Sequence, residues 1–392
     1  MSGWRWRVAA AAYAFAVTMT GTTLPTPLYG LYRDQLGFSA TTQTTIYATY
    51  AVGVIVALVL AGQSSDGFGR RPVLLVGLAA SALSAVAFLL PVGLETLFTG
   101  RLLSGLSAGL FTGTATTALV ELAPAAQVRL TSLVATAANI LGLGAGPLLA
   151  GVLAQFAPRP LTTPYLVHLG LLAVAGALTL TQPETVTSPR EQRPPWRPLR
   201  PSVPAGVRAA FVPAALSGFA GFATFGVYTA LEPRFLAEIL GVQGLAAAGA
   251  VTALVFLASV AAQAATRDLD TRRALPLGCA LLVVGTGVLA LSLDLASLGL
   301  FLLATAVLGA GHGTAFRAGI ASVAGAAPPE RRGEVTSTLF VVLYVGISLP
   351  VVGVGALSQA AGLLTAGLVF AGCVALLALA ALVAVLRRPG TA

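Results

Sequence analysis

Residues 41–90, TTQTTIYATYAVGVIVALVLAGQSSDGFGRRPVLLVGLAASALSAVAFLL, hold two apolar runs on either side of a short charged turn. Each run is about 20 residues long, which is the length that a helix needs to cross roughly 30 Å of hydrocarbon. In lipid, only helices and closed barrels satisfy their own backbone hydrogen bonds. The stretch therefore predicts two membrane-spanning helices joined by a tight polar turn.

The rest of the chain has the same character. Hydrophobic residues make up 57% of the 392 residues, charged residues make up 9%, and the mean hydropathy is +0.90. This is more apolar material than one soluble core can bury, so lipid has to cover the remainder. The predicted spans lie at residues 8–31, 41–63, 73–92, 96–120, 130–156, 163–181, 208–231, 244–265, 274–293, 297–322, 335–357 and 363–386.

The first six spans and the last six resemble each other at a nearly constant offset of about 204 residues. Gly109 and Pro124, for example, recur as Gly313 and Pro328. An even repeat of six helices keeps both halves in the same orientation and places the substrate between them, near the middle of the membrane. We therefore predict an all-α membrane protein of twelve transmembrane helices in two pseudo-symmetric six-helix bundles. The bundles comprise residues 1–181 and 208–392, and a cytoplasmic Pro/Arg-rich linker at residues 182–207 joins them.

The distribution of the basic residues predicts the topology. All 22 are arginine, and the formal net charge is +9. Most fall on one side of the predicted membrane; the exceptions are Arg33, Arg159 and Arg234 on the other side and Arg101 and Arg317 inside spans. By the positive-inside rule, the arginine-rich side, with both termini and the linker, is cytoplasmic. The charge thus reflects topology rather than nucleic-acid binding. The Arg-only, Ala- and Gly-rich composition is consistent with the inner (cytoplasmic) membrane of a bacterium.

Signals of other functional classes do not occur in the sequence. It has no Gly-x-x-x-x-Gly-Lys nucleotide loop, no His-Glu-x-x-His zinc pattern and no paired aspartates for prenyl or phosphoryl chemistry. The two cysteines, Cys279 and Cys373, both lie in predicted spans and are too few for a disulfide framework or a metal cluster. We expect no enzymatic activity, no metal and no cofactor, and a monomer that carries a small-molecule substrate through the lipid bilayer.

The turn between the second and third spans reads GQSSDGFGRRP at residues 62–72. Its spacing of a glycine, three residues, an aspartate, two residues, a glycine and a basic pair resembles the loop signature of the major facilitator superfamily. The alternative is an ordinary cytoplasmic turn, with glycines for tightness and arginines as topology anchors. The positions that carry the resemblance are Gly62, Asp66, Gly69, Arg70 and Arg71.

In that family the loop acts as a conformational switch, and the resemblance implies the same role here. Asp66 would face the start of the eleventh helix near residues 334–337, where the helix dipole favours a carboxylate. The two arginines would reach acidic groups on neighbouring helices. Glu121, at the cytoplasmic end of the fourth span, is the expected partner of Arg70.

The fourth span holds Arg101 four residues before Gly105, which resembles the family's motif on this helix. In the family this arginine is linked to proton transfer. A guanidinium within a span is costly and usually faces a cavity or a partner. The alternative is an arginine that extends to the outer surface of the membrane.

The fifth span resembles the family's antiporter motif, which consists of a glycine, three residues, a Gly-Pro pair and a further glycine. This motif points to the twelve-helix exporters that exchange drugs for protons. Small residues allow helices to approach closely, and proline bends a helix; generic small-residue packing is the alternative. The residues concerned are Gly142, Gly146, Pro147 and Gly151.

The sequence offers several candidates for the group that would couple transport to protons. The first span has no acidic residue, although several drug antiporters of this group carry a carboxylate there. The remaining candidates are Asp34, Glu232 and His312, together with Arg101. Glu232, near the outer end of the seventh span, could face the central cavity or pair with Arg234 in a loop.

Hydroxyl and aromatic side chains on the first two spans are suited to bind a modest-sized, partly apolar molecule. The candidates for the cavity wall are Thr22, Thr26, Tyr47 and Tyr50, with Arg317 in the tenth span. The alternatives are interhelical packing for the hydroxyls and a backbone carbonyl partner for Arg317. We predict proton-coupled efflux of drugs or metabolites; the alternative is an uptake or export carrier for a sugar or another polar metabolite.

Overall fold

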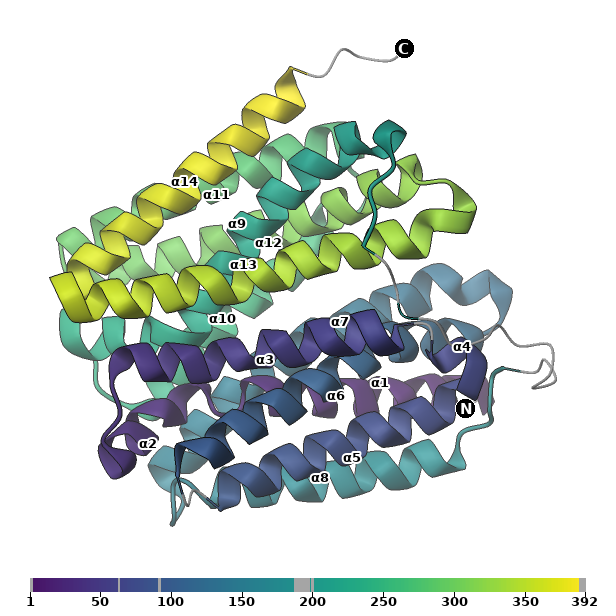
Figure 1. Cartoon of the computed structure of the whole chain (residues 1–392), viewed down its shortest axis with the longest axis horizontal. Coiled ribbons are helices and arrows are strands. Elements are labelled where there is room, and N and C mark those ends of the chain that lie inside the picture. Colours follow the sequence, from purple (N-terminus) through teal and green to yellow (C-terminus); the bar gives the residue numbers. More distant parts are fainter. Residues whose placement is uncertain (1–2, 63, 91–92, 187–197, 199–200, 388–392) are drawn as a thin grey trace. The chain divides into compact units, whose positions relative to one another are not determined.

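A computed structural model describes residues 3–62, 64–90, 93–186, 198 and 201–387 (Figure 1). These residues form helices and no strand. Among them are twelve segments that are long and apolar enough to cross a membrane. The predicted all-α fold with twelve spans is therefore confirmed. Linker residues 187–197 and 199–200, which include several of its arginines, lie outside the described residues, as does Gln63 of the charged turn.

The chain divides into two compact units, of which the first comprises residues 1–37 and 49–200. The first turns of α3, up to Ala48, belong to the second unit instead. The helices of the first unit are α1 (Gly3–Thr23), a 3-10 turn (Thr26–Leu28), α2 (Tyr29–Leu36), most of α3 (Ala40–Ala61), α4 (Ser64–Phe68), α5 (Arg70–Leu89), α6 (Leu94–Glu121), a 3-10 turn (Ala125–Gln127), α7 (Val128–Phe156) and α8 (Thr163–Thr181).

The second unit comprises residues 38–48 and 201–392. The limits predicted for the two bundles and the linker stay a prediction. The helices of this second unit are a 3-10 turn (Ala205–Val207), α9 (Arg208–Arg234), a π-helical turn (Phe235–Ile239), α10 (Leu245–Ala265), α11 (Thr271–Asp294), α12 (Leu298–Ala326), a 3-10 turn (Pro329–Arg331), α13 (Arg332–Ala361) and α14 (Leu363–Leu386).

The first span is broken rather than continuous. α1 ends at Thr23, and a 3-10 turn at Thr26–Leu28 leads into α2. The predicted span over residues 8–31 lies within one apolar segment long enough to cross a membrane, Gly3–Leu36, but its helix is interrupted because Pro25 and Pro27 have no backbone N–H to donate to the preceding turn. α2 ends at Leu36, and the next residue, Gly37, caps it in the left-handed conformation with a φ of +67°.

The internal repeat is visible in how the helices cross within each unit. A Cβ atom on Gly105 of α6 would lie 2.0 Å from the carbonyl oxygen of Tyr50 in α3. In the second unit, a Cβ atom on Gly309 of α12 would lie 2.4 Å from the carbonyl oxygen of Val255 in α10. Both distances are too short for any side chain, so equivalent glycines allow equivalent close crossings.

Candidate functional site

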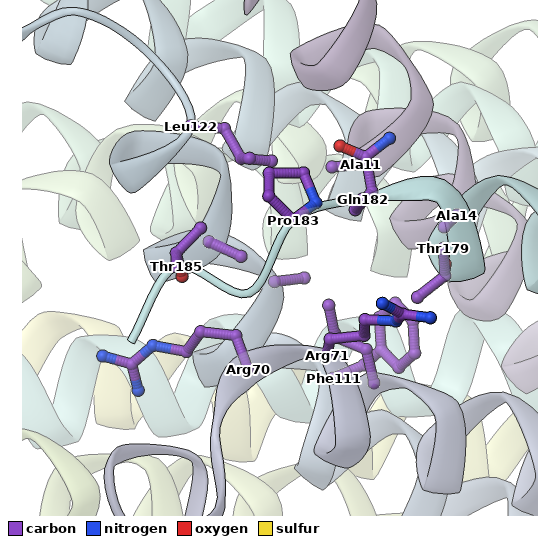
Figure 2. A pocket seen from close by; sticks show the side chains of 13 residues that line it. Ala11, Ala14, Arg70, Arg71, Phe111, Leu122, Thr179, Gln182, Pro183 and Thr185 are labelled. Atoms are coloured by element: carbon purple, nitrogen blue, oxygen red, sulfur yellow. The ribbon is translucent and has the colours of Figure 1, made fainter. Parts of the chain in front are cut away.

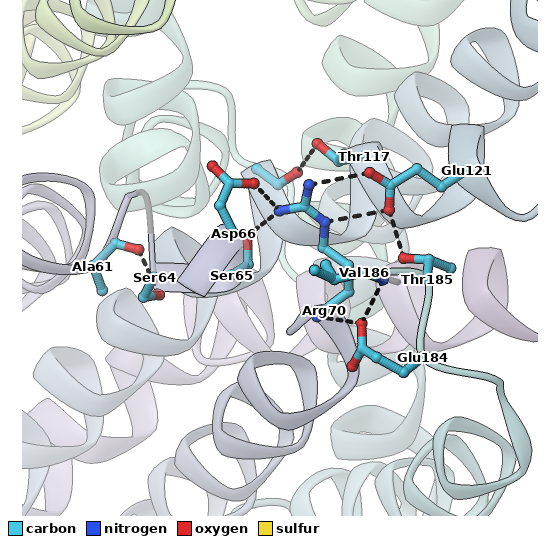
Figure 3. Close-up of polar contacts among 11 residues, drawn as sticks. Ala61, Ser64, Ser65, Asp66, Arg70, Thr117, Glu121, Glu184, Thr185 and Val186 are labelled. Atoms are coloured by element: carbon cyan, nitrogen blue, oxygen red, sulfur yellow. Dashed lines mark hydrogen bonds and ion pairs between the residues drawn. The ribbon is translucent and has the colours of Figure 1, made fainter. Parts of the chain in front are cut away.

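The charged turn between α3 and α5 is organised around Arg70. The Nη1 atom of Arg70 donates to Asp66 Oδ1 at 2.5 Å and to Ser65 Oγ at 2.6 Å (Figure 3). Asp66 belongs to the one-turn helix α4, whereas Arg70 is the first residue of α5. The ion pair therefore ties the two helices together across the tight turn that Gly69 makes.

Glu121, the last residue of α6, completes this network. The Nε and Nη2 atoms of Arg70 donate to its two carboxylate oxygens at 3.3 and 3.1 Å. This is the ion pair that the sequence predicted. The bidentate, charge-assisted geometry fixes the direction of the guanidinium as well as adding attraction. Arg70 thereby joins the loop to the end of α6.

Glu184, which the sequence reasoning missed, lies at the start of α5. Its carboxylate accepts the backbone N–H of Arg70 at 2.8 Å and of Arg71 at 3.1 Å, and also that of Val186 at 3.0 Å. The first N–H groups of a helix have no partner within it, and a negative charge there is favoured by the helix dipole. Glu184 therefore acts as a cap for α5, although it follows α8 and lies 114 residues away in the sequence.

The same contact explains one glycine of the loop signature. Gly69 has a φ of +104°, and a Cβ atom there would lie 2.6 Å from Glu184 Oε2. The hydroxyl of the next residue in the chain, Thr185, donates to Glu121 at 2.5 Å. The segment after α8 is thus attached to the start of α5 through Glu184 and to the end of α6 through Thr185.

A narrow cavity of about 20 Å³ lies beside this network (Figure 2). Arg70, Arg71 and Gln182 line it together with an apolar wall that includes Phe111. The Oε1 atom of Gln182 is buried and has no hydrogen-bond partner among the described residues. A cavity of this size has room for about one water molecule.

Arg101 lies inside the first unit and is only 1% exposed. Its Nη1 atom donates to the carbonyl oxygen of Thr22 at 2.5 Å, and its guanidinium carbon lies 4.8 Å from the centre of the Tyr50 ring. The alternative of a side chain that extends to the membrane surface is therefore wrong. The cation–π contact and the carbonyl partner offset part of the cost of burying this charge. Its role in proton transfer stays a prediction.

The glycines of the fifth span lie where α7 crosses α1. A Cβ atom on Gly142 would be 2.4 Å from the carbonyl oxygen of Ala16, and one on Gly146 would be 2.3 Å from Thr23 Oγ1. Pro147 and Gly151 are buried further along α7. The predicted pattern therefore lies at a close helix crossing, while its link to antiport stays a prediction.

Glu232 is fully buried near the end of α9. Its Oε2 atom accepts a hydrogen bond from the Thr252 hydroxyl of α10 at 2.7 Å, and its Oε1 atom has no hydrogen-bond partner among the described residues. Arg234 pairs instead with Glu238, at 2.7 Å. The alternative of a loop acid paired with Arg234 is therefore wrong. Glu232 lies within α9, and the guanidinium of Arg234 pairs with Glu238, one turn later.

His312 lies in an aromatic cluster of the second unit. Its Nδ1 atom shares a hydrogen bond of 3.1 Å with the Ser259 hydroxyl, and the imidazole is 4% exposed. Its ring centre lies 3.8 Å from that of Phe225, 5.4 Å from that of Phe222 and 5.5 Å from that of Phe316. The Nε2 atom, on the far side of the ring from Ser259, has no hydrogen-bond partner among the described residues.

The remaining candidates are dispersed. Asp34 has a side chain that is 75% exposed and lies 4.0 Å from Arg33. Arg317 donates to the carbonyl oxygen of Leu269 at 3.3 Å, which is the backbone partner that the sequence left open. The other four cavity candidates also have their own surroundings: Thr22 donates to the Met19 carbonyl, Thr26 is buried, Tyr47 shares a hydrogen bond with Thr229, and the Tyr50 ring faces the Arg101 guanidinium.

No metal site is formed by the part of the chain that the structure describes. There, no group of three or more His, Cys, Asp or Glu side chains is arranged to hold an ion.

Comparison with known proteins gives a family match, two partial matches to curated relatives and matches to solved structures. The sequence profile of the Major Facilitator Superfamily matches residues 9–349. A triacylglyceride transporter of Mycobacteroides abscessus is 41% identical over 66 residues, which are 17% of this chain and 13% of that protein. The class B tetracycline resistance protein of Escherichia coli is 32% identical over 115 residues, which are 29% of this chain and 28% of that protein. The chain thus matches less than a third of either relative's length.

Among solved structures, a bacterial homolog of the human lysosomal transporter Spinster superposes with a TM-score of 0.77. The match covers 100% of both chains at 14% sequence identity. At that identity the likeness concerns the fold alone.

Proposed function

The chain belongs to the major facilitator superfamily and is a multi-pass membrane transporter; from this premise we propose that it exports small, partly apolar molecules in exchange for protons. The two six-helix halves would alternate in giving the substrate access to either side of the membrane. The location would be the cytoplasmic membrane of a bacterium, with both termini in the cytoplasm and a monomer as the working form.

The observation that carries the proposal is the environment of Glu232. An ionised carboxylate that is buried among helices is expensive unless a cation or several donors compensate it. Among the described residues, the Thr252 hydroxyl is its hydrogen-bond partner, and Arg234 is engaged with Glu238. Binding a proton removes that cost, and releasing it requires a change of surroundings. This is the property that a proton-coupled carrier needs in one of its carboxyl groups.

Three further features support export of a partly apolar cargo. The small-residue pattern on α7 resembles the antiporter motif, and the names of two relatives refer to tetracycline resistance and to triacylglyceride transport. The aromatic rings around His312 are suited to flat or apolar molecules, with the imidazole as a hydrogen-bonding group. His312 and Arg101 would assist in binding substrate or moving protons.

The loop around Arg70 would be the conformational switch. The ion pairs of Arg70 with Asp66 and Glu121 hold the loop in one arrangement, and breaking them would accompany the change of access. Asp66→Asn should then impair transport while leaving membrane insertion intact.

Everted membrane vesicles test the proposal directly. An imposed proton gradient should be dissipated when an exported compound is added, for which we would use tetracycline, ethidium, a sugar and an amino acid as a panel. Glu232→Gln should abolish the substrate-driven proton movement, whereas the matched control Glu238→Gln should retain it. Proton-independent exchange of the sugar alone would favour the polar-metabolite carrier instead. No response to any compound would count against export.

A further inference from the structure

Pro147 creates a gap in the hydrogen bonding of α7. A helix residue normally donates its N–H to the carbonyl four residues earlier, and proline has no N–H to donate. The carbonyl oxygen of Leu143 is therefore left without its usual partner inside a membrane-spanning helix. In lipid, no water is available to satisfy such a group, so a partner has to come from the protein.

The partner is the hydroxyl of Thr23 at the end of α1. Its Oγ1 atom lies 2.7 Å from the Leu143 carbonyl oxygen, and the two residues are 120 positions apart. The same hydroxyl lies 3.5 Å from the carbonyl of Thr20 in its own helix, which is at the limit of a hydrogen bond. Because a hydroxyl has one hydrogen, the shorter contact with Leu143 takes it.

Gly146 makes this contact possible. A Cβ atom at that position would lie 2.3 Å from Thr23 Oγ1, so any larger residue would push the hydroxyl away. Gly142 serves the same approach one turn earlier, since a Cβ atom there would lie 2.4 Å from the carbonyl oxygen of Ala16. The glycines bring α1 and α7 together, the proline exposes an acceptor, and Thr23 supplies the donor.

Other threonines of α1 behave differently. Thr18, Thr20 and Thr22 donate to carbonyls of their own helix at 2.8, 2.9 and 2.8 Å. Pro350 occupies the related place in α13, but the residues of α9 that correspond to Thr23 are Gly226 and Val227, which have no hydroxyl. At the related place in the second half, these two residues therefore offer no hydroxyl to the carbonyl that Pro350 leaves without a partner.

We propose that Thr23 is a positioning residue for transport, because its hydroxyl replaces the backbone hydrogen bond that Pro147 removes. The contact fixes α1 against the proline bend of α7, so the two helices move as one unit during the transport cycle. Thr23 acts through the backbone of α7 and need not touch the cargo. The transport consequence rests on the proposed function, whereas the hydrogen-bond replacement does not.

A double-mutant cycle tests the replacement. Thr23→Val removes the donor while keeping the shape, Thr23→Ser restores a hydroxyl, and Pro147→Ala restores at position 147 the backbone N–H that can donate to the Leu143 carbonyl. Thr18→Val is the matched control, since Thr18 is fully buried in α1 and bonded within it. Each variant is purified in lipid nanodiscs, its thermal unfolding midpoint is measured, and transport is followed in everted vesicles.

Thr23→Val should lower the midpoint by a few degrees and reduce kcat with KM unchanged, and Thr23→Ser should restore both. In the Pro147→Ala background, Thr23→Val should have no further effect on the midpoint. An equal loss in both backgrounds, or an equal loss in Thr18→Val, would overturn the proposal. If the wild-type protein moves none of the compounds, the proposed function fails, yet the thermal cycle still decides whether Thr23 replaces the missing bond.

Discussion

Removing the carboxylate of Glu184 should loosen the start of α5. Glu184→Ala deletes the acceptor of two helix N–H groups, those of Arg70 and Arg71, together with the negative charge at the helix N-terminus. Loss of a cap costs about 1 kcal/mol, and loss of a favourable charge there costs about 0.3–1 kcal/mol. The sum, about 1.3–2 kcal/mol, corresponds to an increase of about ten- to thirtyfold in local opening, since 1.4 kcal/mol is a factor of ten.

Hydrogen exchange followed by mass spectrometry measures this opening in a peptide that covers the first turn of α5. Glu184→Gln keeps an acceptor and loses only the charge, so its exchange should rise by about two- to fivefold. Glu330→Ala, which removes an exposed acid in the second unit, should leave the same peptide unchanged. The reasoning is refuted if Glu184→Ala leaves exchange at α5 unchanged, or if it speeds exchange equally in α11.

Three further predictions concern the same regions. Gly69→Ala should lower the free energy of unfolding by about 1–3 kcal/mol, because φ is positive there and the Cβ atom would meet Glu184. Thermal unfolding measures this loss. Gly113→Ala is the control, since a Cβ atom there would meet no atom of another element within 4 Å. Arg70→Lys should slow transport several-fold in vesicles, because an ammonium group cannot keep the bidentate contact; an unchanged rate would contradict the switch role. Thr252→Val should slow proton-coupled transport and Thr252→Ser should not, since only the former removes the donor to the buried carboxyl.

The fold follows from the sequence because its cause is local and repeated. Runs of about 20 apolar residues have one stable solution in lipid, and twelve such runs with related halves leave few alternatives. The exception was the first span, where Pro25 and Pro27 interrupt the helix within an otherwise apolar run. The hydropathy of that run predicts a continuous helix, whereas the prolines cannot donate the backbone hydrogen bonds that a continuous helix needs, so the helix is interrupted.

The candidate site was only partly predictable because its contacts join distant residues. The ion pair of Arg70 with Glu121 could be expected, since opposite charges at the same membrane side have few other partners. Glu184 and Thr23 could not be found in this way, because each satisfies a backbone group more than 100 residues away. The available signals were a helix start with no capping side chain before it and a proline within a span. Each shows that a partner is needed without showing which residue supplies it.

The two halves share their packing but not their chemistry, and the reason is physical. A close helix crossing requires a glycine wherever one backbone meets another, so Gly105 and Gly309 are held to the same residue type. No such requirement applies to the side chains nearby. Four residues before each glycine, the first half has the buried Arg101, which donates to a carbonyl of α1, whereas the second half has Thr305, whose hydroxyl donates to the Phe301 carbonyl at 2.7 Å and lies 3.1 Å from the Tyr228 hydroxyl. A scaffold whose helix crossings are fixed by glycines can therefore hold a charge in one half and a neutral hydrogen bond in the other. We expect this to allow the two halves of a carrier to move alike while their side chains bind different groups.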